Sequence, residues 1–107
     1  MTVYIGVKSS SVDEAYRWVE KATGLRAEAR ESSDWGGSYY KFSAPSGEIA
    51  KLLSNRDVYD DEPVVSGCDE WIVVLLVERA NSMSPIVFVL IKDTEHFVLV
   101  PPAKKAG

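Results

Sequence analysis

The chain has 107 residues, of which 46% are apolar, and a formal net charge of −4 from 12 basic and 16 acidic residues. That length suits one domain whose core needs no disulfide or metal, and the lone Cys68 excludes an internal disulfide. The longest apolar runs, 72–77 and 85–91, fall far short of the ~18–20 residues of a transmembrane helix. The first residues lack the pattern of a signal peptide, so we expect a cytoplasmic protein that makes no membrane contact.

The first quarter of the chain predicts a strand followed by a helix. Residues 2–8 alternate between apolar and polar side chains, which indicates a half-buried strand. An apolar stripe at helical spacing then predicts a helix that ends at Gly24. Ser11 and Glu14 stand in the S-x-x-E spacing of a capping box, so we expect each side chain to bond the backbone N–H of the other residue.

The middle of the chain predicts a hairpin. Residues 25–31 and 39–44 have the patterns of two strands, and the Gly- and Ser-rich stretch 32–38 between them indicates a loop. Residues 48–55 fit either a helical turn or a short strand, and this choice stays open. The following segment, 56–70, is acidic and interrupted by Pro and Gly, so we expect it to be irregular.

The last third of the chain predicts two further strands and one ambiguous element. The continuous apolar run 71–77 is typical of a central strand, and 97–100 predicts a final strand. Residues 85–91 have strand propensity, yet Ser84-Pro85 is also a good start for a short helix, so both readings stay open.

Together these elements predict a single α+β domain over residues 1–102, with residues 103–107 as a disordered tail. We expect an antiparallel or mixed β-sheet with one or two helices packed on one face.

Residues that could carry chemistry are few. A hydrolytic pair of Cys68 and the single histidine, His96, lacks a nucleophile motif, and the acidic neighbours of Cys68 disfavour a reactive thiolate. One cysteine and one histidine do not make a usual zinc site, and the acids near residue 60 lack the spacing of a calcium loop. Phosphate-binding glycine motifs do not occur. We therefore predict that the protein is not an enzyme and has no metal or cofactor.

The charge is uneven along the chain. Between Asp57 and Glu78 there are seven acidic residues and no lysine or arginine. Such a segment repels nucleic acid and attracts basic proteins. Aromatic residues near it, Trp35, Tyr39 and Tyr59, are of the kind that anchors protein interfaces, although Trp35 has the alternative of covering one end of the sheet. The predicted partner-binding residues are Trp35, Tyr39, Asp57, Tyr59, Asp60, Asp61, Glu62, Asp69 and Glu70.

Several of these stretches resemble a family of bacterial immunity proteins that accompany polymorphic and contact-dependent growth-inhibition toxins. The resemblance covers residues 35–78 and depends on short motifs: Gly36-Gly37-Ser38-Tyr39-Tyr40-Lys41-Phe42, Gly47-Glu48, Leu52 with Ser54-Asn55-Arg56-Asp57, Glu62, and Asp69-Glu70-Trp71. It implies a small protein that binds and neutralises one cognate toxin domain, often a nuclease, without catalytic residues of its own. It also implies a helix over residues 84–93.

Other functions stay open beside this one. A different protein-interaction module fits the same surface, and a homodimeric α+β protein that binds a small ligand fits the expected sheet with exposed edges. We therefore expect a protein partner, with the chain itself a monomer or a homodimer.

Overall fold

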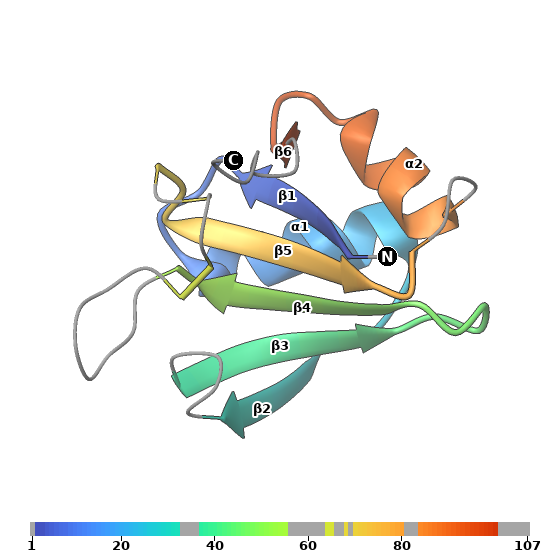
Figure 1. Ribbon diagram of the computed structural model, residues 1–107, viewed down its shortest axis with the longest axis horizontal. Helices are drawn as coiled ribbons and strands as arrows, with labels where there is room; N and C mark the ends of the chain where they lie inside the picture. Colours follow the sequence, from blue (N-terminus) through green and yellow to red (C-terminus); the bar gives the residue numbers. More distant parts are fainter. Residues whose placement is uncertain are drawn as a thin grey trace, which may run out of the picture.

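The computed structural model describes residues 2–32, 37–55, 64–65, 68, 70–80 and 84–100. Within these ranges the elements are β1 (Val3–Val7), α1 (Val12–Thr23), β2 (Glu28–Ser32), β3 (Gly37–Ser43), β4 (Ile49–Ser54), β5 (Val73–Glu78), α2 (Pro85–Ile91) and β6 (Phe97–Val100). The strands form one antiparallel sheet in the order β2-β3-β4-β5-β1-β6 (Figure 1). The predicted α+β class is confirmed, and the sheet is antiparallel.

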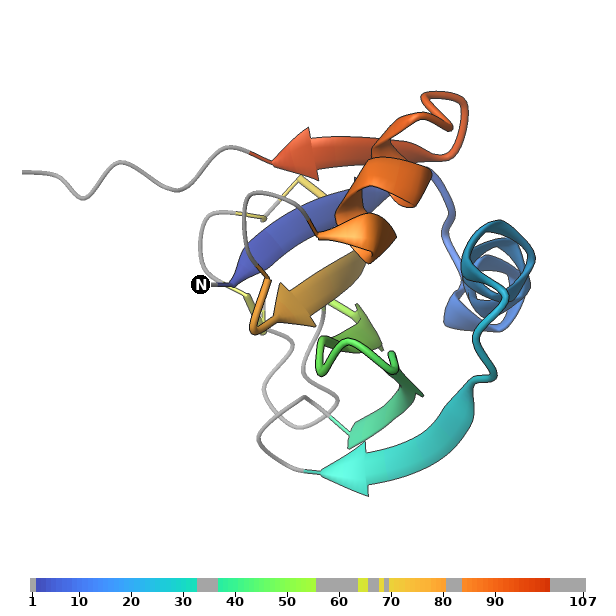
Figure 2. The same cartoon turned by 90° about the vertical axis from the view of Figure 1, so that its right-hand side faces the viewer.

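Both helices pack against the same face of the sheet. Figure 2 shows α1 lying along one side of the curved sheet. Ala15 and Val19 of α1 and Ile86 and Leu90 of α2 share one buried cluster with side chains from five strands. The strand residues of that cluster are Ile5, Val7, Phe42, Ala50, Leu52, Val73, Leu75, Val77 and Phe97. They alternate along their strands, as expected for side chains on one face of a sheet.

The start of α1 differs in detail from the expected capping box. Ser11 is the N-cap, and its hydroxyl accepts a hydrogen bond from the backbone N–H of Asp13 at 3.2 Å. The N–H of Ser11 donates to the Ser9 hydroxyl instead of to Glu14, and that hydroxyl donates to the Glu14 carboxylate at 2.8 Å. The Ser9 hydroxyl thus links the N–H of Ser11 to the carboxylate of Glu14. At the other end Gly24 has φ of 73° and closes the helix as predicted.

Strand β2 begins three residues later than the alternation predicts. The N–H of Leu25 donates to the hydroxyl of Thr23 at 3.1 Å, and the N–H of Ala27 donates to the Glu20 carboxylate at 2.8 Å. These two N–H groups therefore bond to side chains of α1, and the strand begins after them. The expected loop at 32–38 is also shorter, because Ser32 and Gly37 already pair in the β2–β3 ladder.

The two choices that the sequence leaves open are decided by burial. Residues 49–54 form the strand β4, which pairs with β3 and β5 and buries Leu52 and Leu53 on opposite faces. Residues 85–91 form the helix α2, with Ser84 at its N-cap position and Pro85 in its first turn. Ile86 and Leu90 are one helical turn apart and are both buried, so tertiary packing overrides the strand propensity of this run.

The remaining strands agree with the sequence patterns, apart from the start of β5. β1 and β6 lie where they are predicted, but β5 begins at Val73, after Trp71 and Ile72. Among the described residues, no helix is long and apolar enough to cross a membrane. The predicted tail at 103–107 lies outside the described residues.

Candidate functional site

Two of the nine predicted partner-binding residues lie in the described part of the chain. Tyr39, in β3, is partly buried, and Glu70 is exposed immediately before Trp71. The other seven lie outside the described residues: Trp35, Asp57, Tyr59, Asp60, Asp61, Glu62 and Asp69. The candidate site is therefore defined by the described residues that flank the acidic segment.

We call the side of the sheet opposite α1 and α2 the open face. A second buried cluster lies there, made of Leu53, Val65, Cys68, Val74 and Leu76, with Tyr4, Tyr39, Val64, Trp71 and Val100 packed against it. Val65 and Cys68 come from the connection between β4 and β5, and they are 6% and 1% exposed. Described residues of this connection thus pack on the sheet and bury apolar surface there.

Asn55 fastens this connection at several points. Its side-chain amide group donates to the carbonyl of Cys68 at 2.7 Å, and its side-chain oxygen accepts from the N–H of Val65 at 2.7 Å. Its own N–H donates to the carbonyl of Ile72 at 2.7 Å. Asn55 is 3% exposed, so these bonds are shielded from water. We refer to this arrangement as the Asn55 clasp.

The Asn55 clasp joins residues on the two sides of positions 56–63, which include four of the predicted contact acids: Asp57, Asp60, Asp61 and Glu62. Asn55 and Val64 are the described residues on either side of positions 56–63, and the N–H of Val65 is bonded to Asn55 itself. Cys68 adds a further connection, because its carbonyl also accepts from the N–H of Trp71 at 2.9 Å. The sequence gives no sign of the clasp, since a single asparagine at the end of a strand is equally typical of a surface turn.

The indole ring of Trp71 lies close to the backbone of β1 at Gly6. A Cβ atom added to Gly6 would overlap the indole ring of Trp71, so only a glycine leaves room for the ring there. Gly6 sits in the middle of β1 and pairs with Val74 and Val98 on its two sides. The close approach therefore fixes the point at which the acidic connection returns to the sheet.

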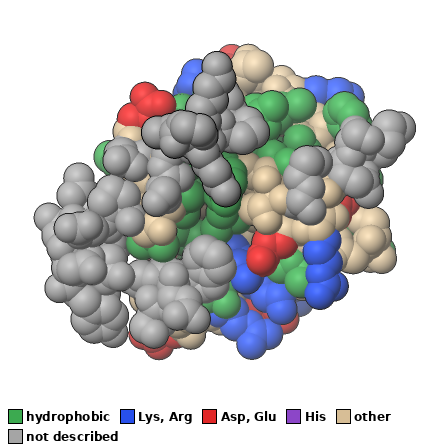
Figure 3. Space-filling model, viewed as in Figure 1, with side chains coloured by type: hydrophobic (Ala, Val, Ile, Leu, Met, Phe, Trp, Pro, Cys, Tyr) green, Lys and Arg blue, Asp and Glu red, His purple; other side chains and the backbone are tan. Residues whose placement is uncertain are grey.

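Charged side chains occupy the other half of the open face. Arg30, Lys41 and Lys51 project from β2, β3 and β4, and Figure 3 shows Lys and Arg side chains gathered where Figure 1 places these strands. Lys51 is paired with Glu78 at 2.7 Å, and Arg30 with Glu28 at 3.3 Å. The latter pair is exposed, so it contributes little to stability.

A polar contact ties α1 to β3 on the helix-covered side. The Tyr40 hydroxyl donates to the carboxylate of Asp13 at 2.9 Å, and its ring stacks on Tyr16 at 4.6 Å. The hydrogen bond to Asp13 is the main cause that raises the pKa of Tyr40, since ionisation of the phenol would break it. This contact fixes the first turn of α1 on the sheet.

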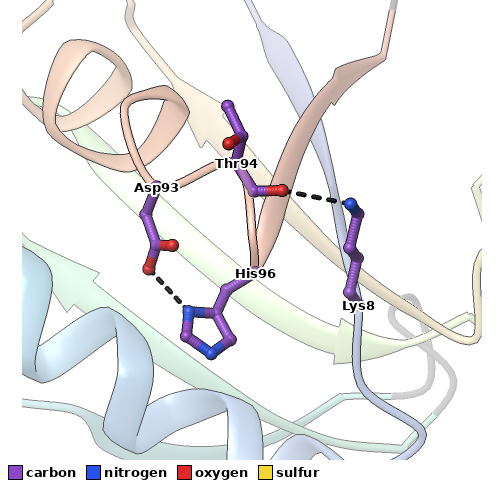
Figure 4. Close-up of polar contacts among 4 residues, drawn as sticks. All are labelled: Lys8, Asp93, Thr94 and His96. Carbon is purple, nitrogen blue, oxygen red and sulfur yellow. Dashed lines mark hydrogen bonds and ion pairs between the residues drawn. The ribbon is translucent and has the colours of Figure 1, made fainter.

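The structure separates Cys68 from His96. Cys68 is buried in the open-face cluster, whereas the His96 ring lies on Trp18 of α1 with 4.0 Å between ring centres, on the other side of the sheet. Figure 4 shows that Nδ1 of His96 points to the Asp93 carboxylate, at 2.7 Å, while Lys8 donates to the carbonyl of Thr94. These two residues therefore do not form a nucleophile–base pair.

No cluster of metal-binding side chains occurs within the described ranges, where groups of three or more His, Cys, Asp or Glu were sought. A scan of protein-family models finds none that matches the chain, and no curated protein matches its sequence.

Proposed function

We propose that the chain is a cytoplasmic immunity protein without enzymatic activity, and that it binds and neutralises a cognate, basic bacterial toxin domain. In this proposal the contact surface is the acidic segment between β4 and β5, together with the aromatic residues Trp35, Tyr39 and Tyr59. The resemblance of residues 35–78 to immunity proteins motivates the choice of partner. The uninterrupted acidic charge gives the physical basis for binding it.

The observation that carries the proposal is the Asn55 clasp. An acidic segment that is long and unanchored would lose conformational entropy on binding, which weakens an interface. Here the residues that flank positions 56–63 are already joined by two buried hydrogen bonds of 2.7 Å. The clasp therefore supports the idea that the acids act as a group at one site.

Charge supports a basic partner over a nucleic acid. Glu78 is paired with Lys51, and the six other acids lie in the stretch 57–70, which has no lysine or arginine. These six attract a cationic protein over distances comparable to the Debye length, about 8 Å at physiological salt. A basic nuclease domain carries the complementary field, because it must itself bind phosphate. An inhibitor of this kind needs no reactive side chain, only a surface that occupies the partner's binding site.

The direct test is co-expression. The toxin candidate is the C-terminal domain encoded by the gene next to that of this chain, expressed in a bacterial host with and without this protein. We expect growth arrest by the domain alone and restored growth on co-expression. Normal growth with the domain alone, or arrest that co-expression does not relieve, would contradict the proposal.

The acidic surface is tested by matched charge reversal. Asp60, Asp61 and Glu62 are changed together to Lys. The control changes Glu28, Glu31 and Glu95 to Lys, which alters the net charge by the same amount at exposed positions outside the acidic segment. We expect the first variant to associate with the toxin domain about tenfold more slowly at low salt, with the difference shrinking at high salt. Equal association rates for the two variants would refute the acidic contact.

A homodimer is a less favoured alternative. Among the described strands β2 pairs with β3 alone, and it is exposed along most of its length, which offers a site for strand pairing between copies. However, its residues include Glu28, Arg30 and Glu31, and charges of this kind disfavour edge-to-edge association. Light scattering coupled to size exclusion decides the point, and we expect a monomer.

A further inference from the structure

A pocket of about 300 Å³ lies between the end of α1, the β3–β4 turn and α2. Its walls are mainly apolar and come from all three elements: Leu25, Pro45, Pro85 and Val89. Val89 is 39% exposed, so the pocket opens to solvent beside α2. Its volume is at the lower end of the range for small-molecule sites.

The polar part of the pocket wall includes a buried carboxylate that can accept a further hydrogen bond. Glu48 is 3% exposed, and its Oε1 accepts from the hydroxyl of Ser46 at 2.8 Å. Its Oε2 is buried and has no hydrogen-bond partner in the described part of the protein. Thr23 also lines the pocket, but its hydroxyl already donates to Val19 and accepts from Leu25. The free acceptor is therefore the glutamate oxygen.

The backbone of the turn holds Glu48 in place. The carbonyl of Glu48 accepts from the N–H of Ala44 at 2.9 Å, and the carbonyl of Ala44 accepts from the N–H of Gly47 at 3.0 Å. The last torsion of a glutamate side chain is soft, so a rotation of the carboxyl group can turn Oε2 toward a ligand at small cost. The carboxylate is thus fixed in position and adjustable in orientation.

A buried carboxylate is costly unless a donor, and best a cation, is paired with it. We propose that this pocket binds a primary ammonium or guanidinium group on a short apolar stem, with Glu48 pairing with the cation and the apolar walls covering the stem. The ligand is either a free alkylamine or a lysine or arginine side chain of another protein. This site does not involve the acidic segment, so its success or failure is independent of the proposed immunity function.

The test is a titration of the isolated protein with n-butylamine, followed through the backbone amide signals of Ser46, Gly47 and Val89 by NMR. The matched probe is n-butanol, which has the same stem without the charge. We expect only the amine to bind. Glu48→Gln should weaken amine binding by about tenfold or more, because it removes the charge that pairs with the ammonium group. The exposed control Glu95→Gln should leave it unchanged.

Three further measurements complete the test. Without any probe, Glu48→Gln should raise the melting temperature, since it removes an unpaired buried charge. Val89→Phe, at an exposed position on the pocket rim, should also weaken amine binding. This variant replaces Glu48→Gln in the test if Glu48→Gln does not fold. A titration with Nα-acetyl-lysine methylamide distinguishes the two sources of the ligand. Binding of this probe indicates a protein side chain as the ligand, and failure to bind indicates a free alkylamine. Equal binding of butanol and butylamine, or unchanged amine affinity in the substituted proteins, would overturn the proposal.

Discussion

The contact between Gly6 and Trp71 gives the sharpest test of how the acidic connection is attached to the sheet. Gly6 has no left-handed φ, so the conformation of β1 does not require a glycine. What requires it is the indole ring of Trp71, which occupies the space of a Cβ. We therefore predict that Gly6→Ala destabilises the protein through overlap alone.

The magnitude follows from two opposing effects. Alanine in place of glycine in a strand would stabilise by about 0.5–1 kcal/mol if there were room, while overpacking costs about 1–3 kcal/mol. Because β1 pairs on both sides and cannot easily move, we expect the clash to prevail and to give a net loss of about 2 kcal/mol. In a domain of this size that corresponds to a drop in melting temperature of about 8–16 °C.

The assay is urea unfolding followed by far-ultraviolet circular dichroism, in a double-mutant cycle with Trp71→Ala. In the Trp71→Ala background Gly6→Ala should become neutral or stabilising by up to about 1 kcal/mol, which gives a coupling energy of about 2–3 kcal/mol. Gly24→Ala is the control, since φ of 73° makes it costly for a reason unrelated to Trp71. Equal costs of Gly6→Ala in both backgrounds would refute the steric reasoning.

Two other predictions concern polar contacts. Asn55→Ala should lower the free energy of unfolding by about 2–4 kcal/mol, because it leaves the N–H of Val65 without its acceptor and removes one of the hydrogen bonds to the carbonyl of Cys68. It should also speed the reaction of the buried Cys68 with a thiol reagent. Ser38→Ala, exposed on β3, should change neither quantity. Since the pKa of Tyr40 is raised in the folded state, its contribution to stability is present below about pH 10 and is lost as the pH rises through the raised value. Asp13→Ala should lower that pKa, as followed by ¹³C NMR of the tyrosine rings, and an unchanged value would contradict the role of Asp13.

The elements predicted best from the sequence are those whose pattern and packing agree. In β1 the alternating residues Val3, Ile5 and Val7 face the core that the helices cover, and in α1 the apolar stripe forms the buried face. Helix α2 is the opposite case. Its β-branched residues favour a strand and the Ser84-Pro85 pair favours a helix start, so the local signals conflict, and burial of Ile86 and Leu90 against the core decides for a helix.

The candidate site is harder to predict because it depends on contacts between distant residues. The acidic run is visible in the composition, but the Asn55 clasp joins residues 10 and 13 positions apart. Gly6 and Trp71 are separated by most of the domain, and neither residue type alone indicates a close approach. Glu48 also gives no signal, since a glutamate after a turn is ordinarily exposed. Its burial follows from the packing of three elements around one pocket.

The two faces of the sheet are stabilised differently, so we expect substitutions on one face to affect folding and substitutions on the other to affect binding. The helix-covered face buries a large continuous core from both helices and five strands, whereas the described part of the β4–β5 connection is held on the open face by Asn55, Trp71 and a small cluster. Regions with fewer buried contacts open at lower free energy than the core. Truncation in the main core, such as Leu75→Ala, should therefore unfold the whole domain. Loss of the Asn55 side chain should leave the sheet and α1 intact, because its hydrogen bonds to Val65 and Cys68 do not join two strands or a helix. If the acidic segment is the contact surface, a protein without the clasp retains its helical circular dichroism and binds the toxin domain more weakly, and full affinity in that protein would show that the clasp has no part in binding.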